Sequence, residues 1–141
     1  MRKFENFCKA LENLKDIFNY EESYGNVEMT GMVGLFEICF EQAWKAMKEI
    51  LEAAGYSESQ TGSPRQILKT AFAAGLIAEE ALWLETLASR NNASHAYNQN
   101  VALQMIEKTK NVYYQMFVKF RKIAEASWME TNIQKEQEEG L

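Results

Sequence analysis

The sequence is poor in the residues that most metal sites and covalent active sites require. Its 141 residues include one histidine, two cysteines and one aspartate, Asp16. A structural zinc site needs four cysteine or histidine ligands, and a di-iron helical bundle uses Glu-x-x-His pairs. One chain can supply neither, and it also lacks a glycine-rich phosphate loop and a Gly-x-Ser-x-Gly elbow. We therefore expect neither a metal nor a cofactor.

Basic charge and long apolar runs are also scarce. The net charge of −5 at pH 7 argues against a broad nucleic-acid interface, because phosphates need a basic face, but it leaves room for a small basic pocket. No run of about 18 apolar residues could span a membrane, and the N-terminus lacks the apolar stretch of a signal peptide. Cys8 and Cys39 lie in apolar surroundings, which favours reduced thiols over a disulfide. These features predict a cytoplasmic protein that does not enter membranes.

Apolar residues instead recur every three to four positions along almost the whole chain. That spacing is typical of helices with one buried face. It predicts three long helices over about residues 2–21, 32–54 and 99–128, and two short ones over about 64–75 and 78–88. The sequence therefore predicts an all-α, up-and-down helical bundle over residues 1–128, followed by a polar tail over residues 129–141.

Local signals mark where these helices begin and end. Gly55 follows the second apolar stripe at the position of a left-handed C-terminal cap. Ser63 and Pro64 suit the N-cap and the first position of the third helix, and Asn98 suits the N-cap of the last helix. Some apolar residues of the last helix fall outside its stripe and are candidates for a dimer face: Leu103, Tyr114 and Val118.

Two weaker patterns bear on catalysis. Gly62 and Ser63 resemble the opening of a nucleotidyltransferase site, but that chemistry holds its metal ions with Asp-x-Asp, and no aspartate follows residue 63. The chain is therefore not itself such a nucleotidyltransferase. Glu37 and Glu41 share one helix face, as a two-carboxylate site requires. Glu41 and Lys45, however, form an ordinary i,i+4 pair, which favours a solvated face.

The segment over residues 90–98, RNNASHAYN, places the only histidine between an arginine and a tyrosine. A purely structural interpretation stays open for it. Arg90 would cap the carbonyl groups of the preceding helix, the asparagines would form the turn, and His95 would make a local hydrogen bond.

The same segment also suits phosphate chemistry. A helix N-terminus offers free backbone N–H groups in a positive field, and an arginine grips phosphate through two parallel hydrogen bonds. A histidine transfers protons near neutral pH without a metal. These parts fit RNA cleavage in which the ribose 2′-hydroxyl attacks the adjacent phosphate, His95 acts as acid or base, and Arg90 stabilises the oxyanion. The reaction needs both an acid and a base, so one histidine per chain implies a symmetric dimer.

The spacing of Arg90, Asn91, His95 and Tyr97, written RNNASHAY, resembles the signature of the HEPN superfamily. More narrowly, the chain is similar to the nucleotidyltransferase substrate-binding proteins over residues 2 to about 125. Four stretches in family order carry this resemblance: RKFENFCKAL, FEICFEQAWKAMKEIL, SPRQILKTAFAAGLI and LWLETLASRNNASHAY. The acidic tail falls outside it.

The resemblance implies a HEPN-like dimeric bundle that is encoded beside a minimal nucleotidyltransferase, as the toxin of a toxin–antitoxin pair. It implies a metal-independent endoribonuclease in which Arg90 and His95 are catalytic and Asn91 supports them. The partner nucleotidyltransferase would silence it by transferring AMP to Tyr97. Two alternatives stay open: a non-catalytic dimeric binding module that presents substrate to the nucleotidyltransferase, and a bundle with a purely structural role.

Overall fold

The computed structural model describes residues 1–56 and 62–129, and every regular element within these ranges is helical. In chain order the elements are α1 (Arg2–Leu14), η1 (Lys15–Asn19), α2 (Asn26–Ala53), α3 (Pro64–Ala73), α4 (Glu80–Asn91), η3 (Asn92–His95), α5 (Gln99–Lys108), η4 (Thr109–Tyr113), α6 (Tyr114–Ile123) and η5 (Ala124–Met129). The elements η1 and η3 are 3-10 turns, whereas η4 and η5 are π-helical turns.

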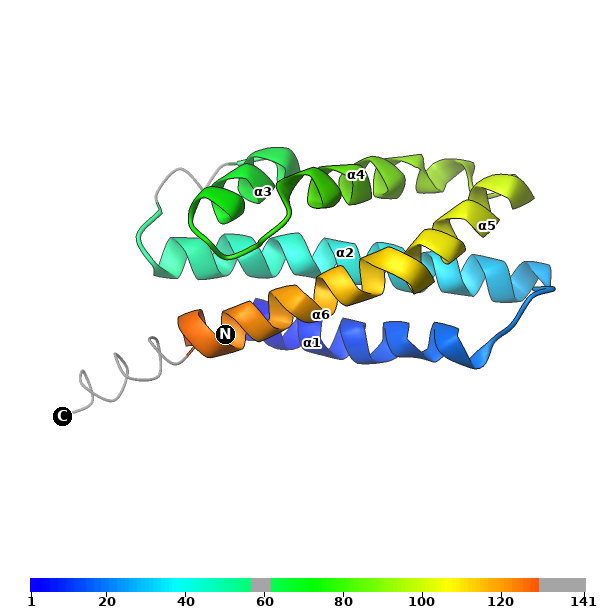
Figure 1. Cartoon of the computed structure of the whole chain (residues 1–141), viewed down its shortest axis with the longest axis horizontal. Coiled ribbons are helices and arrows are strands. Elements are labelled where there is room, and N and C mark those ends of the chain that lie inside the picture. Colours follow the sequence, from blue (N-terminus) through cyan, green and yellow to red (C-terminus); the bar gives the residue numbers. More distant parts are fainter. Residues whose placement is uncertain (57–61, 130–141) are drawn as a thin grey trace.

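The helices pack side by side as an up-and-down bundle, which confirms the predicted fold class. The longest helix, α2, lies along the middle of the bundle, with α4 beside it on one side and α1 on the other (Figure 1). From α5 to η5 the chain forms one continuous rod that crosses from the end of α4 to the start of α1 (Figure 1). The end of α4 and the start of this rod therefore meet at one end of the bundle.

The predicted helix ends form as their local chemistry requires. The Ser63 side chain accepts a hydrogen bond from the Gln66 backbone N–H at 3.3 Å, and Pro64 occupies the first position of α3. The Asn98 side chain accepts from the Asn100 backbone N–H at 2.9 Å and caps α5. Gly55 has a φ of +95° after α2, a conformation that side chains with a Cβ rarely adopt.

A cluster of aromatic rings joins three of the helices at the core. Trp83 on α4 lies 5.6 Å from Phe117 and 5.9 Å from Phe120, both on α6, between ring centroids. Phe7 on α1 lies 5.0 Å from Phe120. All four side chains are buried, and each such burial contributes about 1.5–3 kcal/mol to the free energy of unfolding. This cluster fixes α4, which carries the arginine of the candidate site, against the rest of the bundle.

The end of the first helix needs correction, and the residues proposed for a dimer face have contacts within the chain. The first α-helix ends at Leu14 rather than near residue 21, because the chain tightens into the 3-10 turn η1. The residues proposed for a dimer face are partly buried within the chain and pack against its own core: Leu103, Tyr114 and Val118. Tyr114, for example, packs edge-on against Phe18 at 5.0 Å. Part of each side chain is therefore covered within one chain, and the dimer face stays a prediction.

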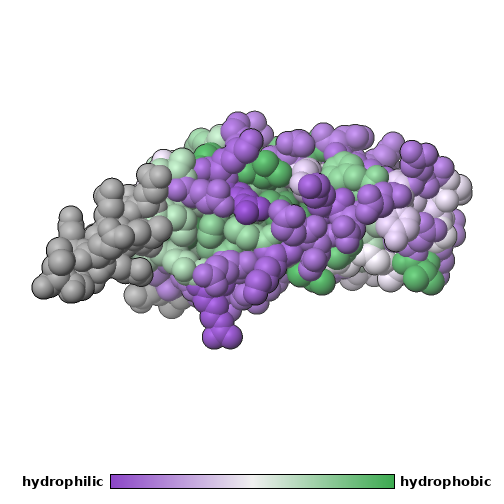
Figure 2. All heavy atoms as spheres, turned by 90° about the horizontal axis from the view of Figure 1, so that it is seen from below, coloured by the Kyte–Doolittle hydropathy of each residue, from purple (hydrophilic) through white to green (hydrophobic). Residues whose placement is uncertain are grey.

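Other expectations concern the surface and the ends of the chain. The face seen from the side of α1 and α6 carries many hydrophilic side chains with apolar ones visible between them (Figure 2). Across residues 1–56 and 62–129, no helix is long and apolar enough to cross a membrane. Both cysteines are free thiols, and burial raises the pKa of Cys8 and of Cys39. Of the tail predicted over residues 129–141, only Met129 lies among the described residues.

Candidate functional site

The arginine-to-tyrosine segment lies at the end of the bundle where α4 meets α5. Arg90 is in the last turn of α4, Asn91 is its last residue, and His95 ends η3. Tyr97 follows in the turn that precedes Asn98, the N-cap of α5. The structure thus confirms the predicted turn that leads into the last long helix.

Arg90 reaches across to α2 instead of capping its own helix. Its Nη1 donates a hydrogen bond to Glu41 Oε2 at 3.1 Å, and its guanidinium carbon lies 5.5 Å from the centroid of the Phe40 ring. The expected capping role is wrong because backbone N–H groups, such as that of Asn92, already bond the last carbonyl groups of α4. Only 26% of the Arg90 side chain is exposed. Its ion pair with Glu41 and its cation–π contact with Phe40 hold it in place.

Glu41 is the centre of this arrangement. Besides Arg90, its Oε2 accepts a hydrogen bond from Trp44 Nε1 at 3.0 Å, and its Oε1 lies 3.6 Å from Lys45 Nζ. The predicted pair of Glu41 with Lys45 is confirmed. The prediction of an ordinary solvated face did not include the contacts of Glu41 with Arg90 and Trp44. Glu41 and Arg90 are 49 positions apart, so no local pattern in the sequence could indicate their contact.

The Arg90 guanidinium keeps donors beyond the one that Glu41 uses. A guanidinium carries five N–H donors and cannot lose its charge in a protein. Arg90 Nε is buried and has no acceptor among the described residues, which is unusual for a buried polar atom. The ion pair therefore orients the arginine without saturating it. Because Nε is itself buried, an anion such as phosphate would be bound by the terminal nitrogen atoms of the guanidinium.

The remaining residues of the motif lie on the surface. Asn91, His95 and Tyr97 are exposed, and Tyr97 has 85% of its surface in solvent. The rings of His95 and Tyr97 lie 6.2 Å apart at an angle of 63°. The structure therefore brings the histidine and the tyrosine together. Within residues 1–56 and 62–129, however, no hydrogen bond links Arg90 to His95, and the side-chain partner of Arg90 is Glu41.

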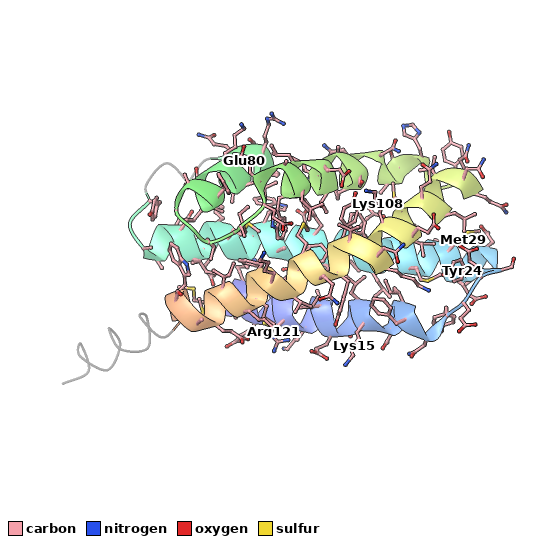
Figure 3. The ribbon with its side chains drawn as sticks, viewed as in Figure 1. Lys15, Tyr24, Met29, Glu80, Lys108 and Arg121 are labelled. Carbon is pink, nitrogen blue, oxygen red and sulfur yellow. The ribbon has the colours of Figure 1, made fainter. Side chains whose placement is uncertain are left out.

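A cluster of polar side chains lies between α4 and the rod that begins with α5. Ser89 Oγ and Tyr113 Oη lie 2.8 Å apart, and Tyr113 Oη donates a hydrogen bond to Glu85 Oε2 at 3.3 Å. Lys108 lies on the part of the rod that faces α4, with its Nζ 3.5 Å from Glu85 Oε1 (Figure 3). Burial raises the pKa of Tyr113, the hydrogen bond from Ser89 opposes this shift, and the charge of Glu85 adds to it. This cluster lines a cavity of about 340 Å³ and ties α5 to α4.

No group of three or more histidine, cysteine, aspartate or glutamate side chains in the described part of the chain could hold a metal ion.

Comparisons with known proteins agree with the fold. Residues 2–126 match the protein family described as "Nucleotidyltransferase substrate binding protein like". The crystal structure of ttk003001694 from Thermus thermophilus is similar, with a TM-score of 0.64 and 25% sequence identity. The similarity covers 84% of this chain and 92% of that one. No curated protein sequence matches the chain.

Proposed function

Since this chain belongs to the nucleotidyltransferase substrate binding protein-like family, we propose that it is the helical partner of a separate minimal nucleotidyltransferase encoded nearby. We further propose that it is a metal-independent endoribonuclease and the toxin of a toxin–antitoxin pair. The observation that carries this proposal is the state of Arg90. Its guanidinium is oriented by Glu41, which bonds one of its terminal nitrogen atoms, and lies five residues before the exposed His95.

The proposed reaction uses two chains. The 2′-oxygen of a ribose forms a bond to the adjacent phosphorus, and the bond to the 5′-oxygen of the next nucleotide breaks. His95 of one chain accepts the proton of the 2′-hydroxyl, while the partner's His95 donates a proton to the leaving 5′-oxygen. Arg90 stabilises the negative charge on the phosphate oxygens in the transition state. The products are a 2′,3′-cyclic phosphate and a 5′-hydroxyl, and Asn91 supports the turn beside them.

The proposed control acts at Tyr97. Its exposed phenol is accessible to a second protein, and its ring lies 6.2 Å from that of His95. AMP on the phenol oxygen would add a bulky anion beside the histidine, and this anion would compete with the RNA phosphate. The nucleotidyltransferase partner would supply the AMP, because this chain lacks Asp-x-Asp.

A second candidate function is a non-catalytic dimeric module that presents substrate to the nucleotidyltransferase. Two observations favour it: the net charge of −5 and the lack of a direct bond between Arg90 and His95 in the described chain. Both candidates place the transferase chemistry on another protein. They differ in whether the purified chain alone cleaves RNA.

The experiment that separates them is cleavage of RNA by the purified chain in EDTA. We expect cleavage by the natural chain and none by His95→Ala, because the chain has no second histidine to take over. Tyr97→Phe is the matched control and should cleave like the natural chain when no partner is present. If the natural chain leaves every RNA intact, the binding module stands; cleavage that persists in His95→Ala removes His95 from the mechanism.

A further inference from the structure

A second groove lies next to the Arg90 site, between the start of α1 and the second half of α2. It has a volume of about 310 Å³ and is lined by Lys3, Trp44, Lys45, Lys48, Glu49 and Glu52. Binding sites for small molecules begin at about this size, so it can take one nucleotide but not a duplex.

Glu41 links this groove to the Arg90 site. Trp44 Nε1 and Arg90 Nη1 donate to the same oxygen, Glu41 Oε2, at 3.0 and 3.1 Å. These two nitrogen atoms therefore lie no more than about 6 Å apart. Lys45, which lines the groove, pairs with the other oxygen of the same carboxylate. The groove and the Arg90 site are therefore separated by a single carboxylate, that of Glu41.

The charge of the groove differs from that of the whole chain. Three lysines and two glutamates line it, although the chain as a whole carries a net charge of −5. One of the two carboxylates, Glu49, already accepts a hydrogen bond from the Lys3 backbone N–H at 3.1 Å. Lys45 is offset by Glu41, so the attraction for an anionic ligand rests on Lys3 and Lys48.

We propose that this groove binds single-stranded RNA, and that it holds the nucleotide adjacent to the phosphate that Arg90 contacts. The base stacks on the exposed part of the Trp44 indole, which is half-buried against the core and is oriented by its hydrogen bond to Glu41, and Lys48 contacts the flanking phosphate. This inference rests on the proposed ribonuclease function and adds a subsite to it. An aromatic face beside lysines is the usual means of holding single strands with little sequence preference.

The test is binding of a fluorescent 2′-O-methyl oligoribonucleotide, which lacks the attacking hydroxyl and therefore reports binding without cleavage. Trp44→Leu should weaken binding between about fivefold and 150-fold through lost stacking, whereas Trp44→Phe, which keeps an aromatic face, should bind nearly as the natural chain does. Lys48→Gln should weaken binding and reduce the slope of log affinity against log salt by about 0.7. Lys122→Gln, a substitution of an exposed lysine on α6 outside the groove, is the charge-matched control and should change the slope less.

Each outcome has a distinct meaning. If the natural chain cleaves RNA but the Trp44 and Lys48 variants bind it as the natural chain does, the groove proposal is overturned and the ribonuclease stands. If the natural chain neither binds nor cleaves RNA, the proposed function itself fails. If the variants keep RNA binding but lose binding to the nucleotidyltransferase, the groove is a protein interface and the proposal is wrong. Thermal unfolding by circular dichroism establishes that Trp44→Leu is folded, and Trp44→Phe keeps the test valid if it is not.

Discussion

Glu41 on α2 holds Arg90 on α4 through a contact of 3.1 Å between Oε2 and Nη1. The arginine of the motif is therefore positioned by a helix that lies outside the motif. Phe40, the neighbour of Glu41, supplies the ring beneath the guanidinium. Because α2 is the longest helix of the bundle and packs against α1 and α4, the geometry of the site depends on the packing of the whole fold.

This relationship predicts that Glu41→Gln lowers the rate of RNA cleavage. Glutamine can still accept one hydrogen bond, but it has no charge to fix the guanidinium, and a small misplacement of a catalytic group costs up to about 100-fold in rate. We expect kcat to fall by about 10-fold to 100-fold. KM should change little or fall, because a negative charge near the RNA phosphate is removed. Steady-state cleavage of a short RNA measures both constants.

Glu37→Gln is the matched control for this substitution. Glu37 lies one helical turn before Glu41 on the same helix, and the same charge is removed without touching Arg90. An equal loss of kcat in both variants would mean that net charge, not the position of Arg90, controls the rate. An unchanged kcat in Glu41→Gln would show that Arg90 needs no support from α2.

The features that the sequence predicts well are those with local causes. The caps at Gly55, Ser63 and Asn98 depend on neighbouring residues only, and all three form. The contact between Glu41 and Arg90 depends on how α2 and α4 pack, and a pattern of i,i+4 pairs favours the nearer Lys45. The π turn η4 could not be predicted either, since its residues continue the helical pattern of apolar positions.

The positions of the tyrosines predict which one receives AMP. Tyr97 has 85% of its surface exposed, whereas Tyr113 has 1% and its phenol is bonded to Ser89 and Glu85. Coexpression with the nucleotidyltransferase should therefore add the mass of AMP to Tyr97, as peptide mass spectrometry would show. Tyr97→Phe should remove the added mass, and Tyr113→Phe should retain it. Modification of Tyr113 or Tyr114 in the natural chain would contradict the assignment.

The buried phenol of Tyr113 predicts a specific dependence of stability on pH. Its pKa is raised, so the folded chain holds this proton more tightly than the unfolded chain does. The resulting stability is fully present below the unfolded value of about 10 and is lost as pH rises through the folded pKa. The melting temperature of the natural chain should therefore fall more steeply above about pH 10 than that of Tyr113→Phe.

Tyr113→Phe should also be less stable near neutral pH, by about 1 kcal/mol, because the hydrogen bonds of its hydroxyl group to Ser89 and Glu85 are lost. Urea unfolding at pH 7 measures this difference. Tyr97→Phe changes an exposed phenol and should leave the unfolding free energy at pH 7 as it is. Both variants remove one tyrosine hydroxyl, which is buried and bonded in Tyr113 and exposed in Tyr97. Equal unfolding free energies of the two variants would argue that the cluster between α4 and α5 does not stabilise the fold.

The arrangement of Arg90 and His95 predicts that the active form is a dimer. Each chain has one histidine, and the proposed cleavage uses one histidine as the base and another as the acid, so the two come from two chains. Light scattering should show a dimer. A large excess of His95→Ala should suppress the activity of the natural chain by forming mixed dimers with one histidine, whereas the same excess of an inert protein should not. A monomer at high concentration, or full activity in mixed dimers, would remove the basis for a shared site, because one His95 would then have to serve as both acid and base.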